Sequence, residues 1–259
     1  MKQKVVFITG ASRGLGKALA EKFLEENYIV CSGVRDLSKA PKGTHPIALD
    51  LTREETLSQA VNDIISSYGK IDILINNAGI AYVGPVDSMT TNEARDLFEV
   101  NFFGPFRLTQ LVLPYMRKQK SGKILFVSST KAVESGAYIG MYSASKAALE
   151  AIAFDWAVTL SKWNISVSVA QPGPIDTGIE FKHGNYFQDQ TPYPTLENIS
   201  LKLQTVNSAR DMIIKNLTKA IPPYRFQTNN ASETIIAQHL VCPSGETWCK
   251  KEADWFDQL

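Results

Sequence analysis

Short apolar runs rich in β-branched residues alternate with longer helical segments over the first two thirds of the chain. This alternation constrains the fold most strongly, because it is typical of a parallel sheet covered by helices on both faces. The predicted strands are 4–9, 28–34, 45–49, 71–76, 122–128 and 165–171, and the predicted helices are 15–26, 53–68, 92–117 and 142–162. We therefore expect an α/β fold with one doubly wound parallel sheet.

The sequence beyond Pro172 departs from this pattern. The segment at about 174–206 has no clear hydrophobic period and is too long for an ordinary connection, which predicts a functional loop. It is followed by a predicted helix (208–220), strand (223–228) and helix (232–240), and about 229–259 forms a C-terminal extension. A chain of this length can bury roughly three quarters of its unfolded surface, so one domain over 1–259 needs no disulfide or metal.

Composition excludes several classes of function. The 27 basic and 26 acidic residues leave a net charge of +1, which gives no long-range field to attract nucleic acid or an anionic membrane. No run reaches the roughly 18 apolar residues that a membrane-spanning helix needs. Cys31, Cys242 and Cys249 form no CxxC pair, so we expect reduced thiols in a cytoplasmic protein, with a Cys242–Cys249 disulfide as the less favoured alternative.

A glycine-rich turn, Gly10-x3-Gly14-x-Gly16, lies where the first predicted strand meets the first predicted helix. Glycines at such a turn let the backbone approach a pyrophosphate at the helix N-terminus and let the helix pack closely on the sheet. The spacing differs from the usual GxGxxG of dinucleotide sites. An ordinary glycine-rich turn is the alternative interpretation.

Two charged residues after the second strand indicate opposite cofactor preferences. Asp36 lies 20 positions beyond Gly16, where an acid binds the ribose 2′-hydroxyl of NAD, whereas Arg35 could bind the 2′-phosphate of NADP. Arg13 in the glycine turn could reach the same phosphate, and two guanidinium groups suit a dianion. We expect NADP(H), with NAD(H) less favoured; alternatively, both arginines are solvated surface charges.

Polar residues also follow two later strands of the predicted sheet. Asn76-Asn77-Ala78-Gly79 ends the fourth strand, and Ser129 comes just after the fifth. Tyr142 and Lys146, 13 and 17 residues beyond Ser129, are four apart and share one helix face. The carboxyl edge of an open α/β sheet is where ligands bind, so these residues form a candidate site.

The combination of a phenol, an ammonium group and a hydroxyl suits proton transfer at a carbonyl. A phenol titrates near pH 10, and lowering its pKa by about three units requires roughly 4 kcal/mol of preferential interaction with the phenolate. Lys146 and a cationic nicotinamide ring could supply it together. Tyr142 would then exchange a proton with a carbonyl oxygen to which Ser129 donates a hydrogen bond.

Taken together, these motifs resemble the classical short-chain dehydrogenase/reductase family over residues 4 to about 177. The resemblance rests on the glycine turn, Asn76-Asn77-Ala78-Gly79, Asn101, Ser129, Tyr142-x3-Lys146 and Pro172-Gly173. It implies a Rossmann-type fold and hydride transfer between a nicotinamide and a small-molecule carbonyl or secondary alcohol. It also implies a catalytic tetrad: Tyr142 as acid/base, Ser129 as polariser of the substrate oxygen, Lys146 as partner of the phenol and ligand of the nicotinamide ribose, and Asn101 as holder of a relay water.

The resemblance further implies a set of cofactor contacts along the same sheet edge. They are Gly10, Ser12, Arg13, Gly14, Leu15, Gly16, Arg35, Asp50, Leu51, Asn77, Ala78, Gly79, Tyr142, Lys146, Pro172, Gly173, Ile175 and Thr177. Asp50 and Leu51 would lie near the adenine, and the last four near the carboxamide. No metal site is expected.

A narrower likeness concerns the 17β-hydroxysteroid dehydrogenase type 1 and retinol dehydrogenase 8 subgroup, whose members prefer NADP(H) and act on steroids or retinoids. It rests on Val34-Arg35-Asp36, Pro172-Gly173-Pro174, Pro223-Tyr224-Arg225-Phe226 and Pro243-Ser244-Gly245. The loop carries apolar residues that could line a pocket for a bulky substrate: Ile179, Phe181, Tyr186, Phe187, Tyr193 and Leu196. His183 is expected to face solvent.

Two other functions use the same fold. One is an NADP(H)-sensing binding protein without turnover, which would have no need of Ser129, Tyr142 and Lys146. The other is an epimerase or dehydratase with tightly bound NAD. The family resemblance also implies a homodimer or homotetramer formed through the helices at 92–117 and 142–162.

Overall fold

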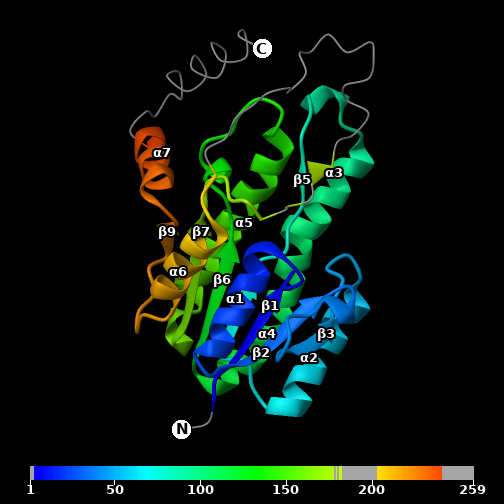
Figure 1. Ribbon diagram of the computed structural model, residues 1–259, viewed down its shortest axis with the longest axis vertical. Helices are drawn as coiled ribbons and strands as arrows, with labels where there is room; N and C mark the ends of the chain where they lie inside the picture. The colour runs from blue at the N-terminus through cyan, green and yellow to red at the C-terminus, as the bar shows by residue number, and fades with distance from the viewer. Residues whose placement is uncertain (1–2, 178, 180, 183–202, 241–259) are drawn as a thin grey trace.

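The computed structural model describes residues 3–177, 179, 181–182 and 203–240. Seven parallel strands form one sheet in the order β3-β2-β1-β4-β6-β7-β9 (Figure 1). Their bounds are β1 Val5–Thr9, β2 Ile29–Val34, β3 His45–Ala48, β4 Ile73–Asn76, β6 Gly122–Val127, β7 Ile165–Gln171 and β9 Arg225–Gln227. The predicted α/β fold with a doubly wound parallel sheet is confirmed.

Helices cover both faces of the sheet. α1 (Gly14–Glu25) and α6 (Val206–Leu217) pack on one face, and α2 (Glu54–Tyr68), α4 (Gly104–Gln119) and α5 (Gly140–Thr159) pack on the other (Figure 1). Successive side chains of β1 therefore point to opposite faces of the sheet and are buried in two different hydrophobic cores. The two edge strands are less buried than the others: Ile47 is the one buried residue of β3, and Phe226 is the one buried residue of β9.

The predicted helix 92–117 is interrupted. α3 (Thr91–Phe98) runs into a π-helical turn, η3 (Glu99–Phe103), before α4 begins at Gly104. In a continuous α-helix the residue at 105 would donate its N–H to the Asn101 carbonyl, but Pro105 has no N–H. Proline thus removes one α-helical bond at this turn, and π-turns of this kind are frequent at functional sites.

The spacing of Thr52 and Glu55 predicts a capping box at the start of α2, and this prediction is wrong. The N-cap of α2 is Arg53, without a side-chain capping bond, and the Thr52 hydroxyl instead donates to Asp50 Oδ1 at 2.8 Å. Asp50 Oδ1 also accepts from the Thr52 N–H at 3.0 Å, which is the donor that a capping box would pair with the Glu55 carboxylate. A reciprocal capping box forms instead at α3, between Thr90 and Glu93.

Part of the predicted loop 174–206 is described. β5 (Ala81–Tyr82) pairs in parallel with β8 (Phe181–Lys182), so the chain after β7 returns beside the chain after β4. The loop residues His183, Tyr186, Phe187, Tyr193 and Leu196 lie outside the described residues, as do Cys242, Cys249 and Pro243-Ser244-Gly245. α7 (Asn230–Leu240) contacts β9. Cys31 is a buried free thiol, and burial raises its pKa to about 12.

Substitution of Gly16 tests how closely α1 packs on the sheet. An added Cβ would lie 2.4 Å from the Gly10 carbonyl oxygen and 2.5 Å from Asn77 Nδ2. We expect Gly16→Ala to lower the free energy of unfolding by about 1–3 kcal/mol, measured by denaturant titration. Gly140→Ala is the matched helical control, because its Cβ would meet only the movable side chain of Val86; equal losses in both variants would contradict this account.

Candidate active site

The glycine turn leaves the N-terminus of α1 open to an anion. Gly10 and Gly14 have φ values of +67° and +54°, which non-glycine residues rarely adopt. Among the described residues of α1, the N-cap Arg13 makes no side-chain capping bond and the first turn holds no acid. Uncapped N–H groups and the helix dipole suit a diphosphate, so this end of α1 fits a dinucleotide.

Three loops converge on this turn at the carboxyl edge of the sheet. A Cβ on Gly10 would lie 2.9 Å from Ala78 Cα, and a Cβ on Gly14 would lie 2.4 Å from the Thr177 carbonyl oxygen. Asn77 Nδ2 donates to the carbonyls of Thr9 (3.0 Å) and Gly10 (3.3 Å). The turns after β1, β4 and β7 therefore pack directly together, as the sequence predicted.

The Asp36 carboxylate accepts hydrogen bonds within its own turn. Its Oδ1 accepts hydrogen bonds from the Ser38 hydroxyl (2.7 Å) and N–H (3.0 Å), which lower the pKa of this carboxyl and cap the 3₁₀ turn η1 (Leu37–Lys39). Arg13 and Arg35 are both exposed at this edge. Burial opposes ionisation of Asp50, but hydrogen bonds from Thr52 and then the charge of Arg35 hold its pKa below the usual range.

Two of the expected cofactor residues have side chains that are buried in the hydrophobic cores, so only their backbone is available to a ligand. The side chains of Leu15 and Leu51 are 5% exposed and pack in the two cores. The Leu51 carbonyl accepts from Arg107 Nη2 at 3.1 Å. Ser12 is half-buried, and Ile175 forms an isolated bridge with Gln204.

Pro172 and Gly173 are packed tightly after β7. The Pro172 carbonyl accepts from the Thr130 N–H at 3.0 Å. A Cβ on Gly173 would lie 2.8 Å from Ser232 Oγ. The backbone here is therefore held against both η4 (Thr130–Ala132) and α7.

Asn101 ties the loop after β4 to α5. Its Oδ1 accepts from the Ile80 N–H (3.0 Å), and its Nδ2 donates to the Ile80 carbonyl (2.9 Å) and to Ser145 Oγ (3.1 Å). Ser145, which the sequence analysis did not single out, also donates to the Tyr142 carbonyl. The signal available in the sequence was its place between Tyr142 and Lys146 on the same helix.

The remaining candidate catalytic side chains are all buried. Ser129, Tyr142 and Lys146 are 8%, 8% and 4% exposed. A Cβ on Gly79 would lie 3.3 Å from Asn101 Oδ1 and 3.4 Å from Lys146 Nζ. The Ser129 hydroxyl lies close enough to the Tyr142 phenol to affect its pKa. All four residues that the family resemblance singled out therefore gather at one edge of the sheet.

Burial dominates the ionisation of this cluster. It raises the pKa of Tyr142, an effect that the hydrogen bond from Ser129 opposes. It lowers the pKa of Lys146 to about 8, against the opposing charge of Glu150. Lys146 does not offset this rise in the pKa of Tyr142, because its Nζ donates to the Val127 carbonyl (2.9 Å) and lies 5.8 Å from the phenol ring centroid. The expected joint effect of Lys146 and a nicotinamide ring stays a prediction.

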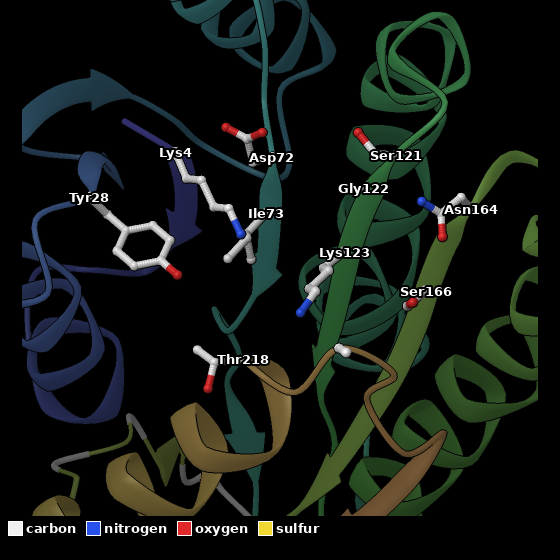
Figure 2. Close-up of a pocket in the computed structure, with 11 residues that line it drawn as sticks. Lys4, Tyr28, Asp72, Ile73, Ser121, Gly122, Lys123, Asn164, Ser166 and Thr218 are labelled. Atoms are coloured by element: carbon white, nitrogen blue, oxygen red, sulfur yellow. The ribbon is translucent and has the colours of Figure 1, made fainter. Parts of the chain in front are cut away.

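A separate cavity lies at the opposite, amino edge of the sheet. Figure 2 shows the amino groups of Lys4 and Lys123 and the hydroxyl of Tyr28 directed toward its centre. Lys123 Nζ donates to the carbonyls of Leu217 (2.8 Å) and Lys219 (2.6 Å), which caps the end of α6. Capping of α6 explains the position of the Lys123 ammonium. The cavity is separate from the candidate active site because it lies at the other edge of the sheet.

The described residues contain no cluster of three or more His, Cys, Asp or Glu side chains placed to hold a metal ion. In the same part of the chain, none of the helices is both long and apolar enough to cross a membrane.

The short chain dehydrogenase family model matches residues 4–185. The chain belongs to this family. Retinol dehydrogenase 8 of Bos taurus is 31% identical, over 95% of this chain and 88% of its own length. The 3-ketodihydrosphingosine reductase of Bacteroides thetaiotaomicron is 38% identical, over 69% of this chain and 66% of its own length.

A short-chain dehydrogenase from Burkholderia cenocepacia, solved in complex with NADP, is 27% identical and superposes with a TM-score of 0.80, over 96% of this chain and 97% of its own. The resemblance to retinol dehydrogenase 8 inferred from the sequence is thus confirmed. This short-chain dehydrogenase is an oxidoreductase with a nucleotide cofactor that acts on a small-molecule substrate.

The buried ammonium of Lys146 makes the stability of the cofactor-free protein depend on pH. Its pKa is lowered on folding, from 10.5 to about 8, so the unfolded chain binds more protons between these values. The wild type should therefore gain stability relative to Lys146→Met by about 1.4 kcal/mol per pH unit above pH 8. Denaturant titrations of both proteins from pH 7 to 10 measure this difference, and a pH-independent difference would contradict burial of the ammonium.

Proposed function

We propose that the protein is an NADP(H)-dependent oxidoreductase that transfers a hydride between nicotinamide and a carbonyl or secondary alcohol. The observation that carries this proposal is the convergence of Asn101, Ser129, Tyr142 and Lys146 at the sheet edge where α1 begins. A protein that only senses NADP(H) has no use for a buried hydroxyl, phenol and ammonium gathered at one edge of the sheet.

The preference for NADP(H) is supported by the residues after β2. The Asp36 carboxylate is used to cap its own turn, so it is poorly placed to accept from a ribose 2′-hydroxyl. Arg35 lies close enough to Asp50 for its charge to affect that carboxylate. A guanidinium at this position, with Arg13 in the glycine turn, would hold a 2′-phosphate by charge-assisted hydrogen bonds. The Burkholderia relative was solved with NADP.

The cofactor supplies the hydride, and the chain supplies the proton and the polar contacts to the oxygen. Because burial raises the pKa of Tyr142, the phenol is protonated at neutral pH and can donate to a carbonyl oxygen that becomes an alkoxide. Ser129 donates a hydrogen bond to the same oxygen as its negative charge develops. The positive charge of Lys146 then stabilises the phenolate that remains.

Asn101 would hold the relay water through its backbone. Both donors of its side-chain amide are already used, by Ile80 and Ser145. The Asn101 carbonyl has lost its ordinary α-helical donor, since residue 105 is proline. A water on this carbonyl would be well placed to return a proton to Lys146, which lies with Asn101 beside Gly79.

A bulky, weakly polar substrate fits the surroundings of Tyr142. The phenol belongs to an apolar cluster with Ala81, Tyr82 and Leu97, to which Ile139, Met141 and Ile179 add their side chains. Apolar walls with a few convergent polar groups are typical of sites for small organic ligands. Retinol dehydrogenase 8 and 3-ketodihydrosphingosine reductase are named for substrates of this kind.

Tyr142→Phe tests the proton transfer. Removing the hydroxyl should lower kcat/KM for carbonyl reduction by about 10²- to 10⁴-fold, while the Kd for NADPH changes little. NADPH oxidation against steroid ketones, retinal and long-chain ketones measures this. Tyr28→Phe, at the opposite edge of the sheet, is the matched control. Full activity of Tyr142→Phe would refute the assigned acid.

Arg35→Ala tests the cofactor preference. Loss of charge-assisted hydrogen bonds to the 2′-phosphate should raise the Kd for NADPH about 10- to 100-fold, by roughly 1.5–3 kcal/mol. The Kd for NADH, which lacks this phosphate, should stay within about twofold. Fluorescence titration with both dinucleotides measures the two values, and an equal change in both would count against recognition of the phosphate by Arg35.

A further inference from the structure

Glu150 is a buried acid that the proposed mechanism does not use. It lies one turn beyond Lys146 on α5 and is 5% exposed. Oε1 accepts from Ser128 Oγ (2.6 Å) and Gln171 Nε2 (2.8 Å), while Oε2 lies 3.0 Å from both Gln171 Nε2 and Arg225 Nη2. A buried carboxylate is costly unless it is paired and hydrogen-bonded, and this one is fully satisfied.

The partners of Glu150 come from the strand ends that build the active site. Ser128 directly precedes Ser129, and Gln171 directly precedes Pro172. Gln227 on β9 donates to Gln171 Oε1 at 2.7 Å. The carboxylate therefore links α5, which carries the phenol and ammonium, to the carboxyl ends of β6 and β7 and, through Arg225, to the start of β9.

The backbone of Glu150 is held as well. The Tyr224 hydroxyl donates to its carbonyl oxygen at 3.1 Å. Helix α5 is thereby attached to β9 through both the main chain and the side chain of one residue. Displacing this residue would shift Tyr142 and Lys146 relative to Ser129.

Glu150 is also the charged side chain that affects the pKa of Lys146. Among the described residues, the other groups found around the ammonium are neutral: the phenol of Tyr142 on α5, the Val127 carbonyl on β6, and Gly79 and Asn101 from the β4 loop and η3. Arg225 on β9 is the cation that pairs with Glu150. Within the described residues, the negative charge of Glu150 favours the protonated amine and burial opposes it.

We propose that Glu150 is a positioning residue of the hydride-transfer site, which keeps Lys146 charged and fixes α5 against the strand ends that carry Ser129 and Pro172. The inference rests on the proposed function, but its effect on Lys146 does not require turnover. Two charges about one helical turn apart interact strongly at this depth, so neutralising Glu150 should move the titration of Lys146 by about one pH unit.

The first test is the pH profile of kcat/KM for carbonyl reduction. In Glu150→Gln, which preserves shape and removes the charge, the alkaline limb should move about one pH unit lower. In Arg225→Met, which removes the cation that offsets Glu150, the limb should move higher. The matched control is Asp72→Asn, another hydrogen-bonded acid but at the opposite edge, which should leave the limb in place.

The second test uses the cofactor-free protein. Glu150→Gln is introduced both into the wild type and into Lys146→Met, and the free energies of unfolding of the two proteins are compared across pH. The difference between them should begin to rise about one pH unit lower than it does without Glu150→Gln. If no carbonyl is reduced but this shift occurs, the proposed function fails and the role of Glu150 stands. If Glu150→Gln and Arg225→Met lower stability without moving either titration, Glu150 is only a packing residue and the proposal is overturned.

Discussion

The parallel direction of all seven strands is the constraint on which the site depends. It brings the carboxyl end of every strand to one edge, so that loops distant in sequence meet there. Gly14 approaches Thr177 and Gly10 approaches Ala78 so closely that a single added Cβ would collide. The same approach leaves the first turn of α1 without a side-chain cap and directed toward this edge, as binding of a diphosphate requires.

Burial of charge is the second constraint. An ammonium group at Lys146 is stabilised in the interior by the Val127 carbonyl and the anion one turn away. That anion is in turn neutralised by Arg225 and by hydrogen bonds from the strand ends. The chemistry proposed for Tyr142 and the positioning proposed for Glu150 thus depend on one connected set of buried polar groups.

Much of this could be predicted from the sequence. Nearly all-apolar strands such as β1 and β4 indicate a covered parallel sheet, and the motifs around Gly10, Ser129 and Tyr142 indicate its functional edge. The π-helical turn at Asn101 was not predicted, since periodicity runs continuously through 92–117. Pro105 removes one α-helical bond there, but the contact of Asn101 with Ile80 exists only in the folded chain. Glu150 was missed because its hydrogen-bond partners come from β6, β7 and β9, which sequence spacing does not connect to α5.

Transfer of a labelled hydride tests the central claim most directly. NADPH carrying deuterium at C4, prepared separately in each of the two configurations, is incubated with the protein and a panel of retinal, steroid ketones, long-chain 3-ketones and small aldehydes. The account predicts that one label configuration appears at the carbinol carbon of a product alcohol, detected by mass spectrometry. Tight NADPH binding with no deuterium in any product would contradict a hydride-transfer role for this site.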